Sequence, residues 1–175
     1  MATAYNFEKV SVLVCDDSRQ IRSLLKGCLT MFGVKSVVEA SNADDAFAKL
    51  VEAQPDLVIT DWNMPPTSGL ELVRRIRQSD DSPDPYVPII MLTAHTELGR
   101  VKIARDNGVS SFLAKPMSAD SLFKRIVSLV EDHRPFIRSG DFFGPDRRHN
   151  VDAPFGGNER RTVAANEPAA AVAAA

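Results

Sequence analysis

Five side chains suited to binding phosphoryl groups and divalent cations lie at the ends of short apolar runs in this sequence. Asp16 and Asp17 follow the first run, Asp61 ends the third, Thr93 ends the fourth and Lys115 follows the fifth. Crowded carboxylates repel one another unless a cation joins them, and Mg²⁺ prefers hard oxygen ligands. An ammonium group and a hydroxyl beside such a cation suit anionic phosphoryl oxygens. We therefore expect a magnesium-dependent phosphoryl site if the fold brings these residues together.

The hydrophobic pattern between residues 10 and 132 alternates between the period of a strand and that of a helix. The first run is nearly continuous in apolar residues, as in a strand buried on both faces. Helical spacing follows, between a capping Ser18 and a terminating Gly33. Four similar pairs come after it. The expected strands are 10–15, 34–39, 56–60, 88–92 and 109–114, and the later helices are 42–53, 68–78, 98–107 and 118–132.

This alternation predicts an α/β fold with a parallel sheet, helices on both faces and right-handed crossovers. The second strand is more polar than the others, which suits an edge of the sheet. We therefore expect a flavodoxin-like, doubly wound (βα)5 sheet with the strand order 2-1-3-4-5. Ligands of such sheets bind beyond the carboxyl ends of the strands, where the five polar side chains fall.

Residues 10–132 resemble the receiver domain of bacterial two-component response regulators. The resemblance depends on Asp16-Asp17 and on the runs Asp61-Trp62-Asn63-Met64-Pro65, Met91-Leu92-Thr93-Ala94 and Ala114-Lys115-Pro116. It implies that Asp61 accepts a phosphoryl group. It also implies a bound Mg²⁺, held directly by Asp17 and Asp61, mostly through water by Asp16, and by the backbone carbonyl of Asn63.

The resemblance further implies roles for residues at the last two strand ends. Lys115 would bind the phosphoryl group, and its bond to Pro116 is typically cis in this family. Thr93 would bond a phosphoryl oxygen after activation, and Phe112 would take the aromatic switch position. Many members carry tyrosine there, so a switch that depends on a phenolic hydroxyl is not expected in this chain.

The domain organisation is expected to be a receiver over residues 8–133 and a C-terminal extension over 134–175. Arg134-Pro135 ends the last helix, and no long periodic segment follows. The apolar residues of 134–148 are expected to fold back onto the receiver near the final helix. Residues 150–175 contain few large apolar side chains, so we expect them to be disordered.

The extension supports an alternative function. It contains Phe143-Gly144-Pro145-Asp146-Arg147-Arg148, which is partly repeated from Phe155 to Arg161. The chain could therefore be a receiver-fold binding module that acts mainly through its arginine-bearing tail. Deletion of the tail would separate this alternative from a switch controlled by phosphorylation.

Composition and charge exclude several other classes. The net charge of −2 gives no single-sign field of the kind that binds nucleic acid or membrane surfaces. Two cysteines cannot make a disulfide framework, and no apolar run approaches the ~18–20 residues of a transmembrane helix. An N-terminal signal peptide is also missing, so a cytoplasmic protein is expected.

The function expected from the resemblance is a phosphorylation-controlled signalling switch rather than a turnover enzyme. A histidine kinase or phosphotransfer protein would be the phosphodonor. Output would pass through contact with an unknown protein target, because no DNA-binding domain follows the receiver. A phosphatase with an aspartyl nucleophile is disfavoured, because Asn63 stands where such enzymes carry a second acid.

Overall fold

The computed structural model describes residues 5–94, 98–146 and 162–163. Strands and helices alternate along the first 130 residues, each within two residues of the bounds predicted from the hydrophobic pattern. They are β1 (Ser11–Cys15), α1 (Arg19–Met31), β2 (Ser36–Ala40), α2 (Ala43–Ala53), β3 (Leu57–Asp61), α3 (Gly69–Gln78), β4 (Ile89–Thr93), α4 (Leu98–Asp106), β5 (Ser111–Ala114) and α5 (Ala119–Val130). None of the helices described here is long and apolar enough to cross a membrane.

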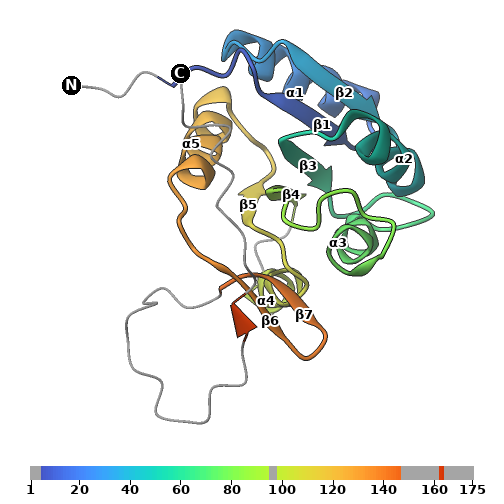
Figure 1. Ribbon diagram of the computed structural model, residues 1–175. Coiled ribbons are helices and arrows are strands. Elements are labelled where there is room, and N and C mark those ends of the chain that lie inside the picture. Colours follow the sequence, from blue (N-terminus) through green and yellow to red (C-terminus); the bar gives the residue numbers. More distant parts are fainter. Residues whose placement is uncertain (1–4, 95–97, 147–161, 164–175) are drawn as a thin grey trace.

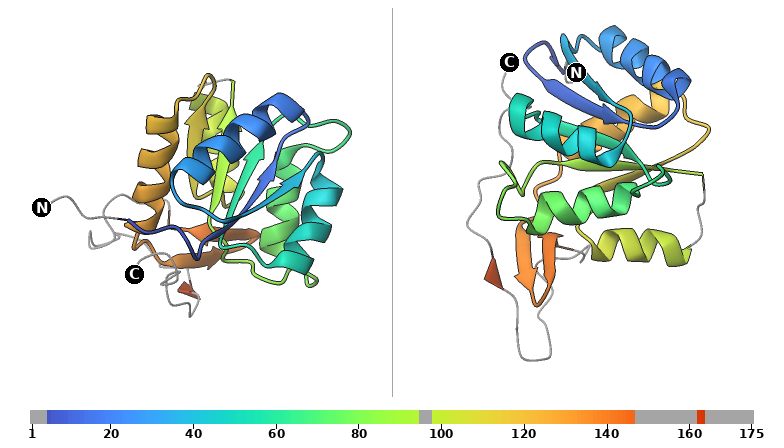
Figure 2. Two further views of the ribbon diagram at one scale, coloured as in Figure 1. Left: turned by 90° about the horizontal axis from the view of Figure 1, so that it is seen from above. Right: turned by 90° about the vertical axis from the view of Figure 1, so that its right-hand side faces the viewer.

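The five strands form one parallel sheet with the order β2-β1-β3-β4-β5, which confirms the predicted flavodoxin-like topology. Helices α1 and α5 cover one face, while α2, α3 and α4 cover the other (Figure 1, Figure 2). The central strand β3 is buried along its whole length. Alternate residues of the strands therefore pack into two separate hydrophobic cores, one on each face of the sheet. Polar side chains are placed at the strand ends.

Polar caps fix where the helices begin. The side chains of Ser18, Asn42, Ser68 and Ser118 each accept a hydrogen bond from a backbone N–H in the first turn of the following helix. At α3, the Glu71 carboxylate also accepts from the backbone N–H of Ser68, which completes a capping box. These caps set the start of each helix relative to the strand end before it.

The C-terminal extension begins with a β-hairpin. Strands β6 (Phe136–Ser139) and β7 (Phe142–Pro145) pair antiparallel across the two-residue loop Gly140-Asp141. A short strand β8 (Thr162–Val163) pairs with the other edge of β6. Disorder had been expected throughout 150–175, so β8 corrects that expectation at these two residues. The rest of 150–175, together with residues 147–149, lies outside the described part of the chain.

The hairpin contacts the end of α3 and the turn before β5, and it lies far from α1 and α2 (Figure 1, Figure 2). Its Phe136 and Phe143 rings lie 5.2 and 5.1 Å from the ring of Tyr86, which precedes β4. Arg77, at the end of α3, is fully buried, and its guanidinium lies 5.2 Å from the centroid of the Phe136 ring. The sequence had placed this segment beside the final helix. The described contacts instead join it to the amino-terminal ends of β4 and β5.

Arg77 ties together the elements beneath the hairpin. Its guanidinium donates to the backbone carbonyls of Gly108, Pro85 and Val87 at 2.7–3.0 Å. It also donates to the Ser110 hydroxyl at 3.3 Å. Burial lowers the pKa of Arg77 to about 9. The carbonyl acceptors satisfy the cation where water cannot reach it.

Candidate functional site

One ammonium group joins the two buried carboxylates at the carboxyl ends of the strands. The Nζ atom of Lys115 lies 2.8 Å from Oδ2 of Asp16 and 2.8 Å from Oδ1 of Asp61. Lys115 follows β5, Asp61 ends β3 and Asp16 follows β1. Since β4 lies between β3 and β5, the lysine side chain reaches across the end of β4 to make these contacts. The fold thus brings together three residues that are 45 and 54 positions apart in the sequence.

Burial gives these charges unusual protonation properties. The Asp16 side chain is 1% exposed, and burial raises its pKa, although the hydrogen bonds from Lys115 and Ser18 oppose the shift. For Lys115, burial by itself lowers the pKa. The hydrogen bonds and charges of Asp16 and Asp61 outweigh that effect, and the pKa of Lys115 is raised. The ammonium group therefore stays charged at neutral pH and offsets the repulsion between the two carboxylates.

Asp17 and Asn63 lie at the exposed rim of the same site. Asp17 is exposed, and its described hydrogen bond is made by its backbone carbonyl. The backbone N–H of Asn63 donates to Oδ2 of Asp61 at 3.1 Å, and the Asn63 side chain is exposed. The Lys115 ammonium group therefore contacts both Asp16 and Asp61, while the Asp17 side chain is exposed to solvent.

Thr93 and Phe112 lie on the neighbouring strands β4 and β5. Thr93 is buried, and its carbonyl accepts a hydrogen bond from the backbone N–H of Lys115 at 2.8 Å. Phe112 pairs in register with Met91, two residues before Thr93, and packs half-buried against the core under α2, α3 and α4. The Lys115-Pro116 peptide bond is cis, as the resemblance implied.

Gly69 is a residue of the site that the sequence analysis did not single out. A Cβ atom on Gly69 would lie 1.8 Å from the backbone oxygen of Asp61 and 2.9 Å from the Thr60 hydroxyl. The Gly69 N–H also donates to the carbonyl of Trp62 at 2.9 Å. The first turn of α3 therefore packs directly on the main chain of Asp61. A glycine directly after the capping Ser68 was the available signal for this close approach.

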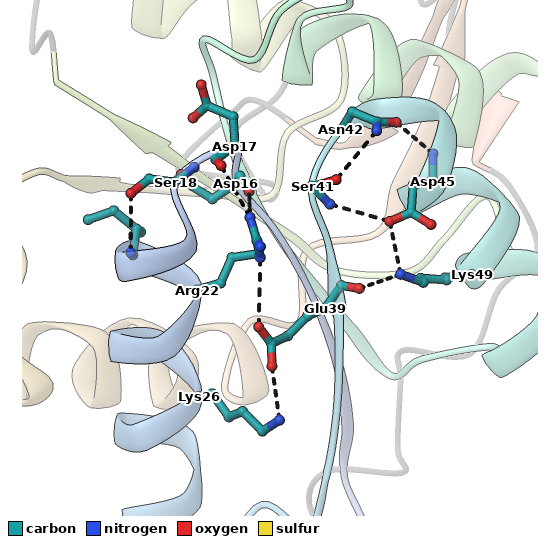
Figure 3. Close-up of polar contacts among 11 residues, drawn as sticks. Asp16, Asp17, Ser18, Arg22, Lys26, Glu39, Ser41, Asn42, Asp45 and Lys49 are labelled. Atoms are coloured by element: carbon teal, nitrogen blue, oxygen red, sulfur yellow. Dashed lines mark hydrogen bonds and ion pairs between the residues drawn. The ribbon is translucent and has the colours of Figure 1, made fainter.

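Arg22 is a second residue that the sequence analysis missed. Its Nη1 atom donates to the carbonyls of Asp16 and Asp17 at 2.7 and 3.2 Å (Figure 3). Its Nε atom lies 3.7 Å from Oε2 of Glu39 on β2. The only available signal was a long cationic side chain in the first turn of the helix that follows the acid pair.

The donor chemistry of the site fits a hard divalent cation. Asp16 and Asp61 share one positive group, and Asp17 adds a third carboxylate at the rim. Within the described ranges, no three carboxylate, imidazole or thiol groups converge closely enough to form a ready metal site. In this structure Lys115 supplies the positive charge that the two buried carboxylates need.

Comparisons with known proteins match most of this chain to a family model and to curated relatives. The family model of the response regulator receiver domain matches residues 12–127. The chemotaxis protein CheY1 of Helicobacter pylori is 36% identical over 118 residues, which cover 67% of this chain and 94% of that protein. The phosphate regulon transcriptional regulatory protein PhoB of Pseudomonas aeruginosa is 34% identical over 125 residues. That match covers 71% of this chain but only 53% of PhoB, so the chain spans about half the length of that relative.

Solved structures agree with this match. The chemotaxis response regulator CheY4 of Vibrio cholerae superposes with a TM-score of 0.61 at 32% sequence identity. The superposition covers 66% of this chain and 93% of CheY4. The matched family model runs from the second residue of β1 through β5 and most of α5. This chain therefore belongs to the family of response regulator receiver domains.

Proposed function

We propose that this chain accepts a phosphoryl group on Asp61 from a histidine kinase or a phosphotransfer protein, and signals by protein contact in the cytoplasm. Receiver domains are phosphorylation-controlled signalling switches, and Mg²⁺ is standard for the family. The observation that carries the proposal is the Lys115 ammonium, at 2.8 Å from both Asp16 and Asp61. A cation in that position can neutralise incoming phosphoryl oxygens next to the acceptor carboxylate.

The chemistry requires little from the protein beyond position and charge. A carboxylate oxygen of Asp61 attacks the phosphorus atom, the new P–O bond forms, and the P–N bond of the donor phosphohistidine breaks. The bonding pair leaves with the imidazole nitrogen. Lys115 stays protonated throughout because its pKa is raised by the two carboxylates against the effect of burial.

Mg²⁺, when bound, would supply further positive charge to the transferred group. The proposed ligands are Asp17, Asp61, the backbone carbonyl of Asn63 and, mostly through water, Asp16. Thr93 and Phe112 are proposed as the switch residues, because they lie on the adjacent strands β4 and β5. The chain would catalyse its own phosphorylation and dephosphorylation without being a turnover enzyme.

The test is chemical labelling of Asp61. With acetyl phosphate and Mg²⁺, intact mass spectrometry should detect one added phosphoryl group of about 80 Da that is stable in acid and lost in base. Asp61→Ala should gain none, and addition of EDTA should abolish labelling of the wild type. Equal labelling of Asp61→Ala would refute the assignment of the acceptor. The alternative function through tail arginines depends on Arg147 and Arg148, which lie outside the described residues.

A further inference from the structure

We propose that Arg22 is a positioning residue for the acid pair, which holds the main chain of Asp16 and Asp17 so that their carboxylates are available at the strand-end site. The inference rests on the proposed function, because the expected consequence is tighter Mg²⁺ binding. It assigns a role to a residue of α1 that contacts neither the proposed acceptor Asp61 nor the proposed phosphate ligand Lys115 in the described contacts.

The first observation is that one nitrogen atom of Arg22 holds both carbonyls of the acid pair. Nη1 donates to the Asp16 oxygen at 2.7 Å and to the Asp17 oxygen at 3.2 Å. The backbone N–H of Arg22 donates to the carbonyl of Ser18, so the residue belongs to the helical turn that starts from the acid pair. Figure 3 shows the guanidinium on one side of this turn and the Asp17 carboxylate pointing away from it.

The second observation is that the guanidinium is anchored at its other side. Nε of Arg22 lies 3.7 Å from Oε2 of Glu39, and Oε1 of Glu39 accepts from Lys26 at 2.9 Å. The hydrogen bond from Lys26, together with the neighbouring cations, lowers the pKa of Glu39, which therefore stays ionised at neutral pH. Lys49 fixes the same residue through its backbone carbonyl at 2.6 Å (Figure 3). The Arg22 side chain is 15% exposed between these contacts.

The third observation concerns what else holds the acid turn. Oδ1 of Asp16 accepts from the backbone N–H of Ser18 at 2.8 Å, and the Asp16 N–H donates to the Ala40 carbonyl at 3.2 Å. The Ser18 N–H belongs to the same peptide group as the Asp17 carbonyl, so the Asp16 carboxylate holds one side of that group, and the Asp17 carboxylate is at the exposed rim. Among the described contacts, the Arg22 guanidinium is what fixes the Asp17 carbonyl. Without it, this peptide is held only through its N–H, by an Asp16 carboxylate that also contacts Lys115, and the position of Asp17 is less well fixed.

The expected effect is therefore on Mg²⁺ affinity rather than on the fold alone. Side chains that orient metal ligands commonly cost about 10–100-fold in metal affinity when they are removed. A lysine at this position keeps the charge but lacks the fork that contacts the carbonyls and Glu39 together. Arg22→Ala should thus weaken Mg²⁺ binding by about tenfold or more, and Arg22→Lys by a smaller factor.

The experiment is an Mg²⁺ titration of the metal-free protein, followed by the amide NMR signals of Asp17 and Asn63. Two matched controls separate positioning from general loosening of α1. Lys35→Ala removes an exposed lysine that pairs with Glu8 outside this network, and Leu29→Ala removes a fully buried α1 side chain remote from the acid pair. Both should bind Mg²⁺ within about twofold of the wild type, although Leu29→Ala lowers the melting temperature.

The possible results of the titration separate the role of Arg22 from the proposed function. Wild-type affinity in Arg22→Ala, or an equal loss in Leu29→Ala, would overturn the role of Arg22. If Arg22→Ala does not fold, Arg22→Lys and Glu39→Gln decide, since both must weaken Mg²⁺ binding. A wild-type protein that shows no Mg²⁺-dependent shifts at all would instead remove the proposed function on which the inference rests.

Discussion

Lys115 is the residue on which the electrostatics of the site depend. Two buried carboxylates share its ammonium group, and removal of one partner from a buried pair leaves an uncompensated charge. The same contacts couple the stability of the protein to the protonation of this lysine. Its pKa is raised, so the folded state holds the proton more tightly than the unfolded chain does.

The first prediction follows from the upward shift of the Lys115 pKa. Lys115→Met should lower the free energy of unfolding at pH 8 by about 3 kcal/mol in the absence of Mg²⁺. The contribution of Lys115 is fully present below its unfolded pKa of 10.5 and is lost as the pH rises through the higher folded value. The difference between wild type and variant should therefore shrink above pH 10.5. Urea unfolding at pH 8 and pH 11 measures it, and a difference that stays constant would contradict the coupling.

The types and strand positions of the polar site residues could be predicted from the sequence, while their supporting residues could not. Asp16, Asp61, Thr93 and Lys115 each adjoin a strand whose hydrophobic pattern is plain. Arg22 acts through a long, flexible side chain whose direction depends on tertiary contacts with Glu39. The role of Gly69 depends on α3 lying directly against the main chain at the end of β3, for which a glycine after the capping Ser68 was the only local signal.

At the scale of elements, the close approach of α3 to the end of β3 can be tested with two glycines. Gly69→Ala should cost at least about 3 kcal/mol and shift Asp61, because the new Cβ would lie 1.8 Å from a backbone oxygen. Gly27→Ala, in the exposed middle of α1 with open space around it, should instead stabilise the protein by about 1 kcal/mol. Urea denaturation compares the two, and changes of the same sign would contradict this account.

The hairpin is the element that the sequence analysis did not resolve. Its signal was present, since Gly140-Asp141 separates two short runs, and a glycine begins many two-residue hairpin loops. The runs are only four residues long, so the apolar cluster was recognised but the strands were not. The partners of that cluster are Tyr86 and Arg77, which are at least fifty positions away along the chain.

We predict that the hairpin unfolds together with the receiver. Phe143 is 3% exposed and its ring contacts those of Tyr86 and Phe136. Phe143→Ala should therefore lower the free energy of global unfolding by about 3 kcal/mol. Arg138→Ala is the control, because this exposed guanidinium lies over the same ring and its loss should cost less than about 1 kcal/mol. An unchanged unfolding midpoint in Phe143→Ala would make the hairpin an independent appendage.

At the scale of the whole molecule, the proposed phosphoryl site and the hairpin lie at opposite ends of the parallel sheet. The site uses the carboxyl ends of β1, β3 and β5, and the hairpin contacts the amino-terminal side of β4 and β5. Two strands thus connect the proposed acceptor end to the extension. Movement of Thr93 and Phe112 could reach the hairpin along β4 and β5 without any contact between the two sites.

The corresponding prediction concerns beryllofluoride, which mimics the phosphoryl group. Its addition with Mg²⁺ should shift amide NMR signals over residues 98–130, because the proposed switch residues Thr93 and Phe112 would bias a two-state arrangement of α4, β5 and α5. Signals of Phe143 and Gly144 should shift as well, since they pack on the turn before β5. The variant Asp61→Asn should show neither change. Shifts confined to the acid pair in the wild type would contradict long-range switching.

The contact between Gly108 and Gly144 has a consequence for transplanting the hairpin between proteins. A Cβ on Gly144 would lie 2.6 Å from the Cα of Gly108, and a Cβ on Gly108 would lie 2.4 Å from the Phe143 oxygen. Two backbones therefore meet where neither has room for a methyl group. A receiver with any other residue at the turn before its fifth strand cannot seat this hairpin, whatever its tail sequence. Glycine at both positions is thus a steric requirement for docking. A grafted extension can be designed to dock by keeping both glycines, or not to dock by replacing one of them.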